Sequence, residues 1–206
     1  MVTSTGVIGR DTKQVEDAGR VLNRAFWDDP AAMYVIPDDA TRSEKLTWFM
    51  TQAASYADLF GEPYTTAENV DGAALWLKPG EWEMPEERMA EAGFGDLPEV
   101  LGEDGYERFG NMFGYMEELH QRDASEPHWY LFILGVEPAR QGQGVGSSLI
   151  QPILRRADED GLPCYLETMK ARNVPFYQKH AFQVVVDEFV PSGGPRLWTM
   201  KRNPAR

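Results

Sequence analysis

Apolar residues recur along the chain at two spacings. Intervals of three and four residues, which are typical of one face of a helix, predict helices over residues 11–26, 40–59 and 105–121. Shorter apolar or alternating runs predict strands, and these cover residues 64–68, 73–78, 129–136, 163–166 and 196–200. The first two strands form an antiparallel pair around a turn at 69–72. This mixture of helices and strands indicates an α/β fold.

The stretch 81–126 is long for a connection between two strands. Because it contains helical spacing, we expect a helical insertion there, which lies between the third and fourth strands of the sheet when a short strand before the first helix is counted. Its apolar stripe has two interpretations, packing against the core or forming the wall of a binding pocket. The stripe consists of Tyr106, Phe109, Met112, Phe113, Met116 and Leu119. A chain of 206 residues suits one well-buried core, so we expect a single domain over 1–206.

The chain is strongly acidic, with a formal net charge of −13. Neutralising the phosphates of a nucleic acid needs clustered lysine and arginine, and no such cluster is visible, so nucleic acid is not an expected partner. The excess of carboxylates has two interpretations. It attracts an amine-bearing small molecule, or it only keeps the protein soluble.

The single cysteine, Cys164, excludes an intramolecular disulfide and a multi-cysteine metal site. Within an apolar run it is expected to be a small core residue. The first residues lack an apolar leader, and no segment approaches the ~20 apolar residues of a membrane span. We therefore expect a cytoplasmic protein that has no membrane partner.

The segment 131–150, LFILGVEPARQGQGVGSSLI, joins an apolar strand to an amphipathic helix through a glycine-rich turn. Gly142, Gly144 and Gly146 let a ligand approach the backbone, and the first amides of the helix have no carbonyl partners. Those amides, at the positive end of the helix, suit a diphosphate. No lysine follows the glycines as in a P-loop, and Ser147 stands where a dinucleotide motif would have its third glycine. A tight turn without a ligand is the alternative.

Two blocks in the second half of the chain resemble a known family. The first is Gln141-x-x-Gly144-x-Gly146, directly after the apolar strand. The second is Asn173-Val-Pro-Phe-Tyr177-Gln-Lys-His-Ala-Phe. In this order they resemble motif A and the asparagine, tyrosine, glycine and phenylalanine segment of the GNAT superfamily of N-acetyltransferases. Ala181 replaces the family's glycine, so we expect a differently shaped turn at that point.

The resemblance, which is detailed over about residues 128–200, implies the GNAT fold. This is an α/β fold whose mixed, mainly antiparallel central sheet is flanked by helices. The resemblance also implies acetyl-CoA as cosubstrate and no metal, with the pantetheine arm along a splayed strand and the diphosphate on the glycine loop. Asn173 hydrogen-bonds the pantetheine, caps its helix, or does both. The expected cofactor-binding residues are Leu134, Gly135, Val136, Gln141, Gly142, Gln143, Gly144, Val145, Gly146, Ser147 and Asn173.

The reaction implied by the resemblance is direct transfer of an acetyl group from the thioester to a primary amine. The amine must be neutral to attack, and the oxyanion and the departing thiolate both need donors. The backbone N–H of Val136 is the expected oxyanion donor. Tyr177 is the expected proton donor to the thiolate, because a phenol with its ordinary pKa of about 10 keeps its proton at neutral pH. A packed aromatic side chain is the alternative role for Tyr177.

Glu167 is the expected general base and acts directly or through water. A carboxylate that only pairs with lysine or arginine is the alternative. His128 has a suitable ordinary pKa of about 6.5, but a lone histidine is more often structural, and His120 and His180 have weaker claims. Two further acceptor-site candidates, on position alone, are Asp28 and Asp29.

The function expected from these features is acetyl-CoA-dependent N-acetylation of a small-molecule amine. A non-catalytic acetyl-CoA sensor and a protein-lysine acetyltransferase are the alternatives. The sequence does not identify the amine. If the chain forms an oligomer we expect a dimer, because the last strand, 196–200, can pair within a subunit or across two.

Overall fold

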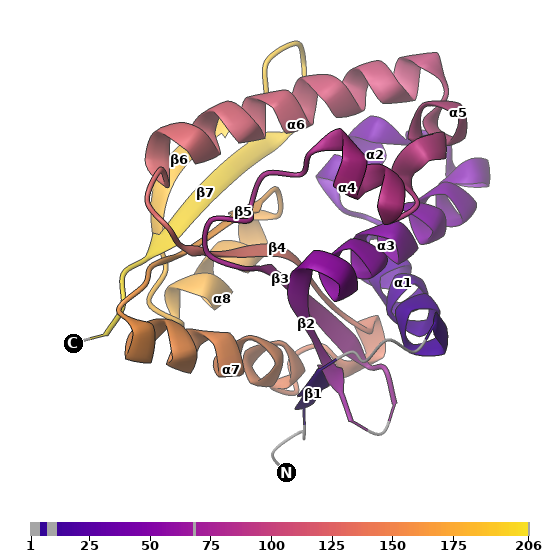
Figure 1. Ribbon diagram of the computed structural model, residues 1–206. Helices are drawn as coiled ribbons and strands as arrows, with labels where there is room; N and C mark the ends of the chain where they lie inside the picture. Colours follow the sequence, from indigo (N-terminus) through magenta and orange to yellow (C-terminus); the bar gives the residue numbers. More distant parts are fainter. Residues whose placement is uncertain (1–4, 8–11, 68, 206) are drawn as a thin grey trace.

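The computed structural model describes residues 5–7, 12–67 and 69–205, and Figure 1 shows a twisted sheet between two layers of helices. Over the described residues the sheet has seven strands in the order β1-β2-β3-β4-β5-β7-β6. The pair β4 and β5 is parallel, and the other neighbouring pairs are antiparallel. The strands are β1 (Thr5–Val7), β2 (Gly61–Thr66), β3 (Gly72–Leu77), β4 (Trp129–Val136), β5 (Cys164–Thr168), β6 (Gln183–Phe189) and β7 (Arg196–Arg202).

Eight α-helices accompany the described part of the sheet. They are α1 (Thr12–Phe26), α2 (Pro30–Val35), α3 (Asp39–Phe60), α4 (Glu86–Glu91), α5 (Leu97–Leu101), α6 (Glu103–Asp123), α7 (Val145–Asp160) and α8 (Val174–Gln178). Short 3₁₀ turns are η1 (Phe94–Asp96), η2 (Pro138–Arg140) and η3 (Ala171–Asn173). The predicted mixed and mainly antiparallel sheet with flanking helices is confirmed. Helices α4, α5 and α6 lie between β3 and β4, in the stretch where the insertion was expected.

The three predicted helices correspond to α1, α3 and α6, and the five predicted strands correspond to β2, β3, β4, β5 and β7. Residues Asp11 and Glu68, which the predicted elements included, lie outside the described residues. The sequence analysis missed α2, which has too few residues for a periodic pattern. Its signal was local: the Asp29 side chain accepts a hydrogen bond from the Ala31 N–H at 2.9 Å, and Pro30 occupies the first helical position.

Strand alternation divides the core into two layers. Leu75 and Leu77 face α1, α3 and α6, whereas Trp76 faces α7. In Figure 1, α6 crosses the sheet on the side opposite α7. The cysteine of β5 is fully buried in the α7 layer, as predicted for a core residue.

The predicted stripe on α6 is correct except at its first residue. Met112 and Leu119 are buried in the core, while Phe109, Phe113 and Met116 are partly buried against it. Tyr106, however, is 45% exposed and faces away from the sheet.

At Ala181, where we expected a differently shaped turn, the backbone has φ of +66°, which is the left-handed conformation that glycine favours. The alanine adopts this conformation after α8 at a conformational cost of about 1–2 kcal/mol. The last strand, β7, pairs with both β5 and β6 of the same chain.

Candidate active site

A gap opens in the sheet where β4 and β5 diverge. Their parallel pairing ends at Leu131 and Leu166, although both strands continue further. The pairing of β4 with β3 shifts register at Phe132, which leaves that residue as a β-bulge. A bulge bends its strand, so β4 turns away from β5 and exposes an unpaired edge.

The peptide groups that face this gap follow from the alternation of the strand. The N–H of Glu137 donates to the Asp71 carbonyl at 2.8 Å, on the β3 side. The backbone N–H and C=O of Val136 and Leu134 therefore face the gap, whereas those of Gly135 face β3. A Cβ on Gly135 would lie 2.6 Å from Leu22 of α1. The close packing of α1 favours glycine here, whereas Leu134 and the Val136 N–H present polar groups to the gap.

The glycine loop leads directly into α7. Gly142 and Gly144 have φ of +74° and +84°, and Gly144 is the N-cap residue of the helix. No acidic residue lies in the first turn of α7, and no side chain caps it. Gly146 differs, because a Cβ there would make ordinary contact with Phe176 at 3.4 Å. Backbone geometry thus requires glycine at two of the three predicted positions, and the first amides of α7 remain available to an anion.

A cavity of about 590 Å³, the loop groove, runs from the β4 edge to this helix terminus. It collects cationic side chains from three separate segments, which is why the sequence showed no cluster. They are Arg140, Lys170, Arg172 and Lys179. Among the groove's lining residues Asp29 is the acid. Arg140 pairs with Asp71, and Lys170 and Arg172 pair with Asp28, so the groove keeps a small excess of positive charge. This excess suits an anionic ligand, although the whole chain carries a charge of −13.

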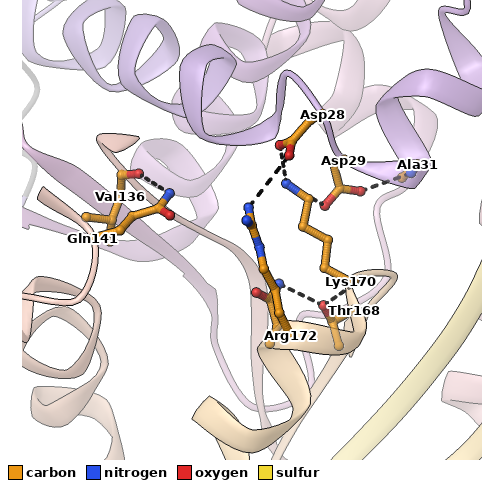
Figure 2. A network of polar contacts seen from close by, with 9 residues as sticks. Asp28, Asp29, Ala31, Val136, Gln141, Thr168, Lys170 and Arg172 are labelled. Carbon is orange, nitrogen blue, oxygen red and sulfur yellow. Dashed lines mark hydrogen bonds and ion pairs between the residues drawn. The ribbon is translucent and has the colours of Figure 1, made fainter. Parts of the chain in front are cut away.

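Two glutamines of the loop bond to nearby carbonyls. Gln141 Nε2 donates to the Val136 carbonyl at 3.0 Å, across the mouth of the β4 edge (Figure 2). Gln143 Nε2 donates to the Ala139 carbonyl at 3.0 Å, inside the loop itself. The first bond ties the loop to β4, whereas the second only stiffens the loop.

A second cavity, the apolar pocket, has a volume of about 140 Å³ and lies deeper in the molecule. Its walls come from α2, α3 and α6 as well as from β4 and β5. Phe109, Met112, Phe113 and Met116 of α6 line it, so the stripe both packs against the core and forms a pocket wall. The apolar pocket adjoins a further hollow of about 180 Å³ that Trp82 also lines. These surfaces suit an apolar ligand.

Tyr177 of α8 lies where the loop groove and the apolar pocket meet, because it lines both cavities. It is 6% exposed, whereas the adjacent Phe176 is partly buried. Burial raises the pKa of Tyr177 well above its ordinary value, and the nearby Asp29 raises it further. The phenol therefore keeps its proton over the whole physiological pH range.

Glu167 lies on β5 and lines the apolar pocket. Its side chain is 4% exposed, and burial raises the pKa of this carboxyl to about 8, although a hydrogen bond from Tyr130 acts in the opposite direction. Among the described residues Glu167 forms no ion pair with lysine or arginine, so that alternative role is wrong. A carboxyl with this pKa accepts a proton readily near neutral pH.

Comparison with known proteins gives the family. The profile of the Acetyltransferase (GNAT) family matches residues 57–182. An uncharacterized N-acetyltransferase of Schizosaccharomyces pombe is 30% identical over 179 residues, which are 84% of this chain and 72% of that protein. The chain belongs to the GNAT family of acetyltransferases. Members of this family are acyltransferases that generally use acetyl-CoA.

Solved structures share the GNAT fold with this chain. An acetyltransferase of Corynebacterium glutamicum, described as histone acetyltransferase HPA2 and related, has a TM-score of 0.71 at 22% identity, covering 100% of this chain and 98% of that one. The polyamine N-acetyltransferase of Drosophila melanogaster has a TM-score of 0.61 at 13% identity, covering 97% and 100%. Arylalkylamine N-acetyltransferase 2 of Aedes aegypti has a TM-score of 0.59 at 14% identity, covering 98% and 100%. At these identities the likeness concerns the fold alone.

A polar network connects the two sides of the GNAT site (Figure 2). Lys170 Nζ lies 2.6 Å from Asp28 and 3.9 Å from Asp29, and Arg172 lies 3.8 Å from Asp28. The hydrogen bond from Lys170 lowers the pKa of Asp28, whereas burial raises that of Asp29. The loop before α2 is thereby tied to the segment after β5. Asp29 also lines both cavities, which distinguishes it from the exposed Asp28.

The other candidates have structural partners. Asn173 Nδ2 donates to Thr168 Oγ1 at 3.0 Å, and its side chain does not cap α8, so the capping role proposed for it is wrong. His180 Nε2 lies 2.9 Å from Ser147 Oγ beside the loop groove. His120 and His128 are buried and contact each other behind Glu167. The sequence did not predict this contact.

The described ranges lack two further kinds of feature. No helix there is long and apolar enough to cross a membrane. Those residues also contain no group of three or more His, Cys, Asp or Glu side chains that could hold a metal ion.

Proposed function

We propose that this chain transfers an acetyl group from acetyl-CoA to the primary amine of a small apolar molecule. The observation that carries the proposal is the position of Tyr177, which lines both the loop groove and the apolar pocket. A ligand in each cavity would meet at this hydroxyl. The donor and the acceptor of the acetyl group can therefore be side by side.

The loop groove suits acetyl-CoA in three respects. The unpaired edge of β4 offers the peptide groups of Leu134 and Val136 to the amides of the pantetheine arm. The first amides of α7 and four cationic side chains favour the phosphates. When bound there, acetyl-CoA would supply the acetyl group as a thioester.

Residues of this chain would meet each need of the reaction. Glu167 takes a proton from the ammonium and so frees the lone pair that attacks the thioester carbonyl. The N–H of Val136, which faces the gap, donates to the oxygen that becomes negative during the attack. Tyr177 gives its proton to the departing thiolate, and its phenolate is restored by the second proton that the nitrogen must lose to become an amide. The proton on Glu167 then returns to solvent.

The walls of the apolar pocket define the class of amine. Aromatic and methionine side chains surround a volume of about 140 Å³, with the further 180 Å³ hollow beyond it. An arylalkylamine or alkylamine places its apolar part against these walls. A polyamine would bring a second ammonium there at a cost in desolvation. A protein lysine would offer these walls only its four-carbon chain.

Calorimetric titration with acetyl-CoA beside free CoA, followed by a thiol-release assay over a panel of amines, tests the proposal. The panel contains an arylalkylamine, a linear alkylamine, a polyamine and a lysine peptide. We expect binding of acetyl-CoA and release of CoA with the first two amines. Binding without release from any amine would favour the sensor, release with the peptide alone would favour the protein-lysine enzyme, and absence of binding would refute the groove.

A further inference from the structure

Two buried histidines form a hydrogen-bonded pair that lies beside Glu167. His120 of α6 and His128, just before β4, are 2% and 0% exposed. Their Nε2 atoms lie 2.7 Å apart. At the far end, His128 Nδ1 lies 2.7 Å from the backbone carbonyl of Glu126. At the near end, His120 Nδ1 lies 3.6 Å from Glu167 Oε1.

The position of every proton in this pair follows from its last acceptor. A carbonyl oxygen can only accept, so the proton of neutral His128 is on Nδ1. His128 Nε2 then has a lone pair and accepts the N–H of His120 Nε2. The remaining nitrogen, His120 Nδ1, must therefore present its own lone pair to Glu167. The Glu126 carbonyl thus fixes both tautomers, although two hydrogen bonds and the 3.6 Å contact separate it from the Glu167 carboxyl group.

Burial favours the neutral form of both rings. Burial lowers the pKa of His120 to about 3, with a smaller contribution from His128, and it also lowers the pKa of His128. Trp82 stacks on the His120 ring at 4.2 Å. Besides Glu167, the titratable or charged groups near the pair are Tyr130 on β4, Tyr165 on β5, Glu117 on α6, Lys201 on β7, Glu126 and, across the hollow, Glu83.

Glu167 Oε1 is a buried oxygen that accepts no hydrogen bond. An ionised carboxylate would hold this oxygen against the lone pair of His120, whereas a protonated carboxyl can donate to it. We propose that the His120–His128 pair is a positioning device that presents a lone pair to Glu167 and thereby favours the protonated carboxyl. The pair makes Glu167 a stronger base without touching the substrate.

This inference rests on the proposed function, in which Glu167 accepts the proton of the ammonium. In that step an N–H bond of the ammonium breaks and an O–H bond forms on Glu167. An O–H on Oε1, the oxygen that faces His120, donates to His120 Nδ1, and neither histidine gains or loses a proton. Closure of the 3.6 Å separation to a hydrogen bond accompanies the step.

The tautomers are measurable in the unmodified protein by ¹⁵N NMR, because the chain contains three histidines. Between pH 6 and 8 we expect neutral His128 with its proton on Nδ1 and neutral His120 with its proton on Nε2. A proton on His120 Nδ1, or a cationic His120 in this range, would overturn the inference. This measurement needs neither a variant nor a substrate.

Two substitutions of His128 test the consequence at a distance from the carboxyl. His128→Phe removes the acceptor of the His120 Nε2–H, so His120 can move its proton to Nδ1 and donate to the carboxylate. The midpoint at which Glu167 titrates should fall from about 8 by about one pH unit, which is tenfold in protonation. His128→Gln retains a carbonyl acceptor and should keep the original midpoint. Tyr165→Phe, a change beside the same cluster, is the matched control.

The midpoint is measured twice, by ¹³C NMR titration of the Glu167 carboxyl without substrate and from the pH profile of kcat/KM. Glu167→Gln identifies the signal. A lower midpoint in His128→Phe alone supports the inference. Equal midpoints in all variants would overturn it. If the carboxyl shifts but the kinetic profile does not, the pair acts as described and the assignment of Glu167 as the base fails instead.

Discussion

The loop groove and the apolar pocket meet at Tyr177, but the groove depends on backbone groups and the pocket on side chains. The groove presents peptide groups from β4 and from the start of α7, and its shape depends on residues with positive φ. The pocket presents side chains from helices that are far apart in the sequence. We therefore expect glycine substitutions to affect the groove and truncations to affect the pocket, with each change leaving the other cavity intact.

The largest expected effect is that of Gly144→Asp, which should raise the Kd for acetyl-CoA at least about 100-fold. The position has φ of +84°, which an L-residue adopts at a cost. The new carboxylate also lies at the helix terminus where the phosphates would be. Because aspartate is a good N-cap residue, the variant should still fold. Isothermal titration calorimetry measures the change.

Gly110→Asp is the matched control, since Gly110 is exposed on α6 and nothing lies within 4 Å of its would-be Cβ. This variant adds the same charge without touching either cavity. If folded Gly144→Asp bound acetyl-CoA as the wild type does, the groove would not be the cofactor site.

Tyr177→Phe acts at the junction and should lower kcat about 100-fold, the lower range for loss of a general acid. The affinity for acetyl-CoA should remain nearly unchanged, because the ring and its packing are retained. Steady-state kinetics and calorimetry on one preparation separate the two. Tyr106→Phe, at an exposed site, controls for loss of a hydroxyl. A wild-type kcat in Tyr177→Phe would remove the proton-donor role.

Phe113→Ala should raise the KM for an arylalkylamine about tenfold, through loss of apolar contact worth about 1–3 kcal/mol. The ring lines the apolar pocket and stacks on Phe109 at 4.1 Å. Acetyl-CoA affinity should not change. Tyr106→Ala on the exposed face of the same helix is the control. If Phe113→Ala bound acetyl-CoA more weakly and kept the KM for the amine, the division between the two cavities would be contradicted.

The same difference, between backbone geometry in the groove and side chains in the pocket, decides what could be predicted from the sequence. The glycine loop was predictable because Gly142 and Gly144 must have positive φ and are neighbours in the chain. The bulge at Phe132 and the resulting gap were not, because no single residue type specifies a register shift. Resemblance to the family supplied the splayed strand, and the residues alone did not.

The pocket and its polar surroundings could be predicted only in part. The stripe on α6 was visible, but its second role depends on α2 and α3, which reach it through the tertiary fold. The four cations of the loop groove and the contact between His120 and His128 join segments that sequence patterns treat separately. Periodicity describes one element at a time, so contacts between distant elements were beyond it.

The smallest expected effect concerns Ala181, where the chain departs from the family's glycine. Ala181→Gly removes the cost of φ at +66°, about 1–2 kcal/mol, but adds chain entropy to the unfolded state, so the net gain should be about 0.5–1 kcal/mol. Ala171→Gly, in an exposed 3₁₀ turn, should have the opposite sign. Urea denaturation measures both. The turn also holds the end of α8 through Phe182 N–H to the Tyr177 carbonyl at 3.2 Å. If kcat is unchanged in Ala181→Gly, the turn affects only the stability of the fold. If kcat changes, the backbone of this turn positions Tyr177, and the chemistry of that side chain depends on backbone geometry, as binding in the loop groove does.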